Sequence, residues 1–258
     1  MFIQGLFTSP DSRSAAIRMN AAKPSTHRQI QDLLIDKGDA GIAAHSQRFF
    51  KTGAGQYGEN DRFLGIRVPE LRKLVKSLRQ VSLPEIRKLL KSPFHEARLM
   101  ALLMLVDRYE HGTSSERDAV FECYITHTAH INNWDLVDAS AHRIVGPHLE
   151  HRDRTLLFKF AQSTNLWERR IAIFSSFHFI KRNDFADTLN LSKILLEDEH
   201  DLIHKVVGWM LREVGKRDKD IADKFLTRYY REMLRTMLRY AIEKHPEEQR
   251  QAYLKGLI

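Results

Sequence analysis

From Ser25 onward, apolar residues recur with the period of an α-helix, and this pattern constrains the fold more than any other feature. Leu99, Leu102, Leu103 and Val106, for example, follow the i, i+3, i+4, i+7 spacing of a buried helix face. No convincing run shows the alternation of apolar and polar residues that is typical of a strand. The sequence therefore predicts an all-α fold.

The helical pattern repeats along the chain. Strongly apolar helices are expected to begin near His95, Trp134, Leu166 and Asp201, so successive starts lie roughly 32 to 39 residues apart, the length of a helix-pair repeat. Short polar connections between the helices favour antiparallel neighbours. We therefore expect an alpha-solenoid of about six helix pairs, similar to HEAT repeats.

The beginning of the chain has a different character. Residues 1–24 mix glycine, serine and proline with isolated apolar residues and show no sustained period. This composition predicts a disordered or flexible extension, and Met19 is an alternative start of the protein. We expect residues 25–258 to form one HEAT-like repeat domain.

The charge balance favours a polyanionic partner. Lysine and arginine total 41 against 33 aspartates and glutamates, which gives a formal net charge of +8. The single cysteine, Cys123, cannot form an internal disulfide, and no run approaches the roughly 20 apolar residues of a membrane span. We expect a cytoplasmic protein that does not associate with membranes and, because no heptad seam is evident, a monomer.

A glycine-containing segment interrupts the helical pattern at residues 51–65. It holds four glycines and leads into Ile66-Arg67-Val68-Pro69. It is not a phosphate-binding loop, because it lacks the Gly-Lys-Ser/Thr ending and no strand precedes it. The segment is interpreted as a flexible connector, with Pro69 in the first turn of the next helix.

The helix expected from Ile203 carries a second stripe opposite its core face. Lys205, Trp209, Arg212 and Lys216 recur at i, i+4, i+7 and i+11. An exposed indole between cations is suited to stacking and cation contacts with a nucleic acid. The alternative is a solvated basic face that carries one isolated tryptophan.

A tryptophan and a carboxylate share a helix face in the segment 131–138. Trp134 and Asp138 are four residues apart, at the margin of the expected core stripe. A carboxylate held beside apolar surface and an aromatic ring can stabilise a developing cation. The alternative is that Asp138 pairs with an arginine of the next helix while Trp134 fills the core.

Two arginines, Arg169 and Arg170, occupy the first turns of another expected helix, where positive charge opposes the helix macrodipole. This placement favours a task such as holding a phosphate or orienting Asp138, although surface arginines are common. The thirteen histidines do not fall into a zinc-binding spacing. We expect neither a metal nor an organic cofactor.

Four segments carry a family resemblance. They are Phe63-Leu-Gly-Ile-Arg-Val-Pro69, Trp134-Asp-Leu-Val-Asp138, Leu166-Trp-Glu-Arg-Arg-Ile-Ala-Ile173 and Gly208-Trp-Met-Leu-Arg-Glu213. With these segments the chain resembles the DNA alkylation repair (AlkD) family from about residue 25 to near its C-terminus. The resemblance implies an alpha-solenoid of HEAT-like helix pairs with a concave basic face that binds duplex DNA, and a DNA glycosylase that removes N3- and N7-alkylated purines without a metal.

The resemblance also implies roles for single residues. Asp138 matches the family's catalytic carboxylate, Trp134 and Trp209 match the tryptophans that flank the sugar of the lesion, and Arg170 matches the arginine that supports them. Asn133 stands where some members carry a further tryptophan, and Phe49 takes the place of an aromatic tyrosine near the lesion. The residues expected to contact DNA are Lys205, Arg212, Lys216, Arg169, Arg67 and Phe49.

An N3- or N7-alkylated purine already carries a positive charge, so its glycosidic bond is weak and only the sugar needs help. Asp138 is expected to stabilise the oxocarbenium-like sugar, and the resemblance implies that the base stays in the helix. Two alternatives stay open. One is a non-catalytic binder of damaged or branched DNA, and the other is a scaffold whose basic stripe docks an acidic protein.

Overall fold

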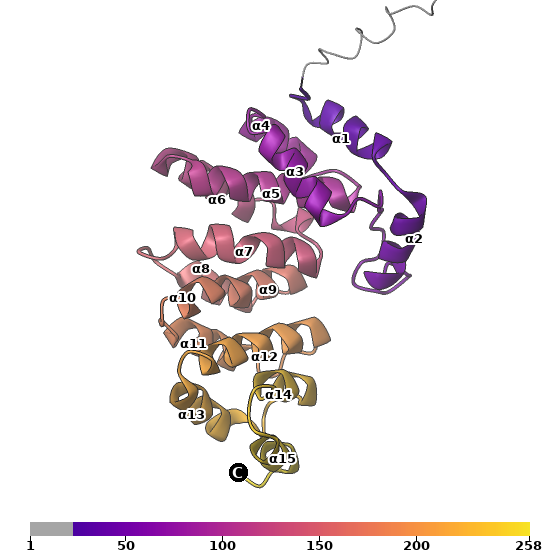
Figure 1. Ribbon diagram of the computed structural model, residues 1–258. Helices are drawn as coiled ribbons and strands as arrows, with labels where there is room; N and C mark the ends of the chain where they lie inside the picture. Colours follow the sequence, from indigo (N-terminus) through magenta and orange to yellow (C-terminus); the bar gives the residue numbers. More distant parts are fainter. Residues whose placement is uncertain (1–22) are drawn as a thin grey trace, which may run out of the picture.

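The computed structural model describes residues 23–258, and this part of the chain is all-helical, without a strand (Figure 1). One isolated bridge joins the backbone of Arg62 to that of Phe94. The predicted all-α fold is therefore confirmed. The extension predicted over residues 1–24 and the alternative start at Met19 fall almost entirely outside the described residues.

Consecutive helices stack on one another from the N-terminal to the C-terminal end (Figure 1). Each helix of the main stack contacts the next one in the series. The main stack consists of α3 (Val68–Ser77), α5 (His95–His111), α7 (Trp134–His148), α9 (Leu166–Ser175), α12 (Asp201–Gly215) and α14 (Arg235–Ala241).

A second set of helices alternates with the main stack along the chain and packs against it. These helices are α4 (Leu83–Leu89), α6 (Ser114–Ile125), α8 (Thr155–Ala161), α10 (Phe177–Ile180), α11 (Ala186–Ile194) and α13 (Lys219–Tyr229). A short 3-10 helix, η2 (Thr128–His130), precedes α7, and α15 (Glu247–Lys255) ends the described chain.

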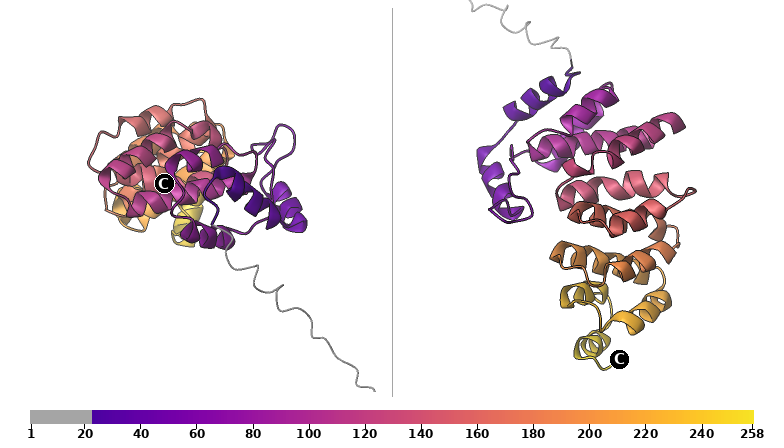
Figure 2. Two further views of the ribbon diagram at one scale, coloured as in Figure 1. Left: turned by 90° about the horizontal axis from the view of Figure 1, so that it is seen from above. Right: turned by 180° about the vertical axis from the view of Figure 1, so that it is seen from behind.

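The two N-terminal helices, α1 (His27–Asp36) and α2 (Ala40–Phe49), lie differently from the rest. Helix α1 packs on α4, whereas α2 and the loop that follows it stand beside the stack, as both views of Figure 2 show. The first turn of α2 is fixed by Asp39, which accepts a hydrogen bond from the backbone N–H of Ile42 at 2.8 Å. This arrangement brings the loop after α2 to one edge of the main stack.

Helix α5 forms because its apolar residues cover nearly its whole circumference, and it is almost completely buried. The four strong helices begin at the predicted residues, His95, Trp134, Leu166 and Asp201. Two of these helices are capped by the side chain of the residue that directly precedes them. Asn133 accepts from the N–H of Trp134, and Asn165 caps α9 by accepting from the N–H of Trp167.

Glu168 stands three residues after the Asn165 cap, but it does not complete a capping box by reaching back to the backbone of Asn165. It accepts instead from the hydroxyl of Ser163 at 2.5 Å and from that of Thr128, on η2, at 2.7 Å. These tertiary hydrogen bonds compete with the local one and fix the start of α9 against the preceding repeat.

Helices α12 and α14 approach each other closely at Gly208. A Cβ atom at this position would lie 2.3 Å from the carbonyl oxygen of Met237 on α14. Only glycine allows this approach, so Gly208 sets the distance between the two helices. The core face predicted for α12 is confirmed, because Ile203, Val206 and Val214 are fully buried.

Two further predictions concern the rest of the chain. Cys123 is buried in α6 and unpaired, as its apolar surroundings indicated. Each helix between residues 23 and 258 is too short or too polar to cross a lipid bilayer.

Candidate functional site

Asp138 and Arg170 form a two-pronged ion pair between α7 and α9. The Nε and Nη2 atoms of Arg170 donate to the two carboxylate oxygens of Asp138 at 2.9 and 2.7 Å. The remaining Nη1 atom donates to the carbonyl oxygen of Leu202, on α12, at 2.7 Å. The buried guanidinium therefore joins three successive helices of the main stack and holds the carboxylate in one orientation.

The electrostatics of Asp138 reflect its surroundings. Burial raises the pKa of this carboxyl above its ordinary value, the Arg170 charge counteracts the rise, and the nearby Asp135 adds to it. The charge of Arg170 therefore does not fully compensate the cost of burying the ionised Asp138 carboxylate. The carboxylate is 16% exposed, so it is still reachable from solvent.

Trp134 lies one helical turn before Asp138 and belongs to a cluster of aromatic rings. Its ring stacks on Phe50, with ring centroids 5.4 Å apart, and meets Phe49 edge to face at 6.1 Å. The Phe49 side chain is 57% exposed. The structure thus brings Phe49 against Trp134, while its contact with DNA stays a prediction.

Trp209, on α12, belongs to a second aromatic cluster. Its ring lies 5.3 Å from that of Phe174 and 6.4 Å from that of Phe177, and its indole N–H donates to Glu213 at 3.0 Å. The indole is half-buried, so the fully exposed ring expected from the sequence is not observed. The covering rings come from α9 and α10, neighbours that helical periodicity alone does not place.

Along α7, Asp138 lies between the residues that belong to or contact the two aromatic clusters. Trp134, Asp138 and His142 follow one another at four-residue intervals and therefore share a face of the helix. The His142 ring contacts that of Phe174 at a centroid distance of 5.3 Å, and Phe174 contacts Trp209. Burial lowers the pKa of His142 to about 4, so this ring is neutral near pH 7.

Each cation of the α12 stripe has an acidic neighbour. Lys205 pairs with Asp201 at 2.6 Å and Lys216 with Glu213 at 2.7 Å. Arg212 pairs with Glu243, the residue that follows Ile242 after α14. The stripe is consequently balanced by carboxylates, and its role in DNA binding stays a prediction.

The other two predicted DNA-binding arginines lie in contrasting surroundings. Arg169 donates to Asp198 at 2.6 Å and to the carbonyl oxygen of Ser163 at 3.0 Å, so it ties the start of α9 to the segment before α12. Arg67 is exposed at the start of α3, where Pro69 occupies the first turn as predicted. Arg67 is thus the freer of the two to reach a phosphate.

Sequence reasoning missed a buried polar cluster next to Trp134. His95 lies between two carboxylates, with its Nδ1 atom 3.2 Å from Asp61 and its Nε2 atom 2.8 Å from Asp135. Arg98 donates to Asp61 at 2.5 Å. Burial alone would lower the pKa of His95, but Asp135 and Asp61 raise it to about 9, so the ring is protonated near pH 7.

Tyr57 is the second residue that sequence reasoning missed. It lies in the loop between α2 and α3, and its ring meets that of Trp167, on α9, edge to face at a centroid distance of 6.2 Å. The loop was interpreted as a flexible connector, yet it reaches α9, the fourth helix of the main stack. No local sequence pattern marks such a contact.

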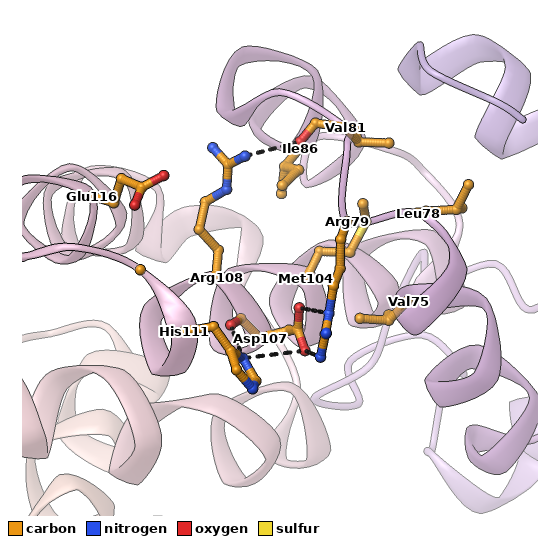
Figure 3. Close-up of a pocket in the computed structure, with 11 residues that line it drawn as sticks. Val75, Leu78, Arg79, Val81, Ile86, Met104, Asp107, Arg108, His111 and Glu116 are labelled. Atoms are coloured by element: carbon orange, nitrogen blue, oxygen red, sulfur yellow. Dashed lines mark hydrogen bonds and ion pairs between the residues drawn. The ribbon is translucent and has the colours of Figure 1, made fainter.

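A well-formed cavity lies away from these residues (Figure 3). Its volume is about 160 Å³, and apolar side chains from α3, α4 and α5 line it beside the ion pair of Arg79 with Asp107. Asp138 and the two indoles do not line this cavity. Among residues 23–258, no group of three or more potential metal ligands is arranged to hold an ion.

The described fold and site define an all-helical protein with an ion-paired carboxylate between two tryptophan-containing clusters. The family model of the DNA alkylation repair enzymes matches residues 30–245. The chain therefore belongs to the DNA alkylation repair enzyme family, and membership indicates an enzyme that repairs alkylation damage in DNA.

The structure is similar to that of a predicted DNA alkylation repair enzyme from Enterococcus faecalis. The TM-score is 0.64 and the sequence identity 17%, and the match covers 81% of this chain and 97% of the other. At this identity the likeness shows the fold alone. No curated protein matches the sequence.

Proposed function

We propose that this protein is a DNA glycosylase that excises positively charged N3- or N7-alkylated purines, such as 3-methyladenine and 7-methylguanine, from duplex DNA. In this proposal the stacked helices are an alpha-solenoid of HEAT-like pairs whose concave face binds the duplex. The observation that supports it most is the position of Asp138, one helical turn from Trp134 and linked through His142 and Phe174 to Trp209. This arrangement supports the proposal that Trp134, Trp209 and Arg170 act together with Asp138.

The proposed reaction needs little from the protein. The C1′–N bond of the alkylated nucleotide breaks, its electron pair leaves with the base and neutralises the base's charge, and the sugar becomes oxocarbenium-like. The negative charge of Asp138 stabilises this sugar and positions the water that adds to C1′. Trp134 and Trp209 hold the nucleotide through contacts of their ring faces, and Arg170 fixes the carboxylate.

The state of Asp138 fits this role. A carboxylate satisfied by many donors gains little from a new positive charge, whereas one with a single partner gains more. Asp138 has only Arg170 as a side-chain donor within the described residues, and burial strengthens its interaction with any charge that develops beside it.

The test is an excision assay on duplex DNA that contains 7-methylguanine or 3-methyladenine. Asp138→Asn should release base about a hundredfold more slowly than the native chain, because it removes a preorganised charge. Asp107→Asn, which alters an ion pair near the C-terminal end of α5, is the matched control and should leave the rate unchanged. Equal release by the native chain and by Asp138→Asn would remove Asp138 from the mechanism.

A second candidate is a non-catalytic binder of damaged or branched DNA. The observation that favours it is the bidentate contact, since both oxygens of Asp138 already accept from Arg170. Such a protein would bind duplex DNA in the same assay without releasing base from any of the alkylated substrates.

A further inference from the structure

Phe50 connects Trp134 with the buried cluster of Asp61 and His95. Its half-buried ring stacks on the Trp134 indole, with ring centroids 5.4 Å apart and ring planes at 26°. The same phenyl ring packs on the His95 imidazole at a centroid distance of 5.0 Å. The proposed reaction gives Phe50 no role, although this residue contacts one of the two indoles on which the reaction depends.

The backbone on both sides of Trp134 is held by the same buried cluster. The Asn133 side chain accepts from the Trp134 N–H at 2.8 Å and donates to Asp61 at 3.3 Å. On the other side, the Asp135 carboxylate lies 2.8 Å from the Nε2 atom of His95. Because the side chains of both sequence neighbours are bound to the cluster, the start of α7 is fixed relative to α5.

The orientation of the Trp134 ring is a separate matter. The indole is half-buried, and a fixed backbone still permits more than one staggered rotamer of its side chain. A flat ring stacked on the indole opposes rotation, because the pair loses its favourable offset contact when the indole turns. Phe50 is placed to supply this restraint.

The two phenylalanines beside Trp134 meet it in different ways. Phe49 meets the indole edge to face, at an interplanar angle of 66°, and is 57% exposed. Phe50 lies nearly parallel to the indole and is half-buried. Since exposed side chains change rotamer within nanoseconds, Phe49 is a poor restraint, and the enclosed Phe50 ring is the better one.

Phe50 is itself held in place by its ring and by its backbone. Its ring stacks on Phe63 at 5.1 Å, and Phe63 stacks on His95 at 4.5 Å, so the three rings contact one another. The Phe50 N–H donates to the carbonyl oxygen of Ser46 at 2.9 Å. A Cβ atom at Gly58 would lie 2.5 Å from the Phe50 carbonyl oxygen, so glycine at this position lets the following loop pack on the Phe50 backbone.

We propose that Phe50 is a positioning residue of the site: its ring, anchored by His95 and Phe63, holds the Trp134 indole in the orientation that contacts the damaged nucleotide. This inference rests on the proposed glycosylase function. An indole that is already oriented has less rotational freedom to lose when the nucleotide binds and reacts. The effect of Phe50 on excision therefore passes through Trp134.

The first experiment compares single-turnover excision of 7-methylguanine by the native chain and by Phe50→Leu, which keeps an apolar side chain but removes the flat ring. We expect the rate to fall about tenfold, the effect of one aromatic pair. Phe225→Leu, which removes a ring contact with Tyr229 inside α13, is the matched control and should keep the native rate. An undiminished rate in Phe50→Leu would overturn the inference.

A double-mutant cycle separates positioning from a general structural role. If Phe50 acts through the indole, Phe50→Leu should slow excision by the native chain but have no further effect in a Trp134→Leu background. A general structural role would slow excision in both backgrounds. Equal slowing in both would therefore overturn the inference even though the rate had fallen.

Fluorine NMR of the chain labelled with 5-fluorotryptophan detects the restraint without any reaction. The chain has three tryptophans, and the Trp134 resonance is identified by its absence from Trp134→Leu. Phe50→Leu should shift this resonance, because the ring stacked on the indole is lost, and should leave the Trp209 resonance in place. An unchanged Trp134 resonance would overturn the inference.

The two kinds of measurement distinguish failure of this inference from failure of the proposed function. If the native chain releases no base but the Trp134 resonance shifts in Phe50→Leu, the proposed reaction fails and the restraint on Trp134 stands. If the native chain releases base and Phe50→Leu changes neither the rate nor the resonance, the inference fails and the proposed function stands.

Discussion

Two aspartate–arginine pairs lie in neighbouring parts of the stack and are built differently. Asp61 accepts from both Arg98 and His95, and its side chain is only 4% exposed. Within the described residues Asp138 accepts side-chain hydrogen bonds from Arg170 alone, and it is 16% exposed. One carboxylate is enclosed and surrounded by donors; the other has one partner and an open side.

The comparison shows that the number of hydrogen-bond donors determines how strongly a carboxylate can still interact with a further positive charge. Burial alone would raise the pKa of Asp61, but the His95 hydrogen bond and the Arg98 charge lower it. For Asp138 burial prevails over the charge of Arg170, and its pKa is raised. The first pair is built to stabilise the fold, and the second retains electrostatic capacity for a new cation.

The largest expected effect is on stability, at the enclosed pair. Asp61→Ala leaves the charges of Arg98 and His95 buried without their shared partner, so we expect a loss of about 3 to 5 kcal/mol in the free energy of unfolding. Urea denaturation of the native chain and the variant measures it. Asp107→Ala breaks an exposed pair with Arg79 and should cost about 1 kcal/mol or less. Similar losses in both variants would mean that the buried Asp61–Arg98 pair contributes no more to stability than the exposed pair.

The protonated state of His95 gives the next largest effect, through pH. Its pKa is raised in the folded protein from 6.5 to about 9, so its stabilising contribution is fully present below pH 6.5 and is lost as the pH rises through about 9. The free energy of unfolding of the native chain, relative to His95→Gln, should fall by roughly 3 kcal/mol over this range. Taking the difference cancels groups that titrate in both proteins. A flat difference would show that His95 is neutral.

The ionised carboxylate of the open pair should affect stability with the opposite sign to that of Asp61, whose pKa is lowered. The pKa of Asp138 is raised in the folded protein, so its ionised form costs stability above that pKa instead of supplying it. Asp138→Asn removes this cost and keeps an oxygen that accepts from Arg170, so we expect the free energy of unfolding to change by about 1 kcal/mol at most. Denaturation at pH 7 is the measurement. A loss as large as that of Asp61→Ala would erase the distinction between the two pairs.

The features that the sequence predicted are local. The starts of α5, α7, α9 and α12 follow from caps and apolar spacing within one helix, and Trp134 and Asp138 share a face because they are four residues apart. The pairing of Asp138 with an arginine of the next helix was also foreseen, as the alternative to a catalytic role, and the structure shows this pairing. The catalytic role stays a prediction.

The features that the sequence did not predict depend on distant contacts. Asp61 and His95 are 34 positions apart, and Tyr57, in the loop before α3, meets Trp167 on α9, so no short window of sequence contains both partners. The exposure of Trp209 was misjudged for the same reason, because the ring that covers it, Phe174, belongs to another helix. Periodicity identifies which face is buried but not which neighbour buries it.

A third pair extends the comparison to the protein surface. Lys205 and Asp201 lie 2.6 Å apart on α12, and their side chains are 40% and 56% exposed. Such a pair contributes little to stability, and its cation can exchange one anionic partner for another. Lys205→Ala should therefore weaken binding to duplex DNA and reduce its dependence on salt by roughly one phosphate's share.

The partner variant of this pair decides what the lysine does. If Lys205 binds a phosphate, Asp201 competes with it, and Asp201→Asn should strengthen binding and leave the salt dependence as steep as in the native chain or steeper. The measurement is a series of fluorescence-anisotropy titrations at increasing salt, with Lys219→Ala on α13 as a control from another ion-paired lysine. If Lys205 only pairs with Asp201, neither variant should change the affinity for DNA at any salt concentration. Opposite changes in the two variants would indicate that Lys205 contacts the DNA and that its ion pair with Asp201 exchanges one anionic partner for another.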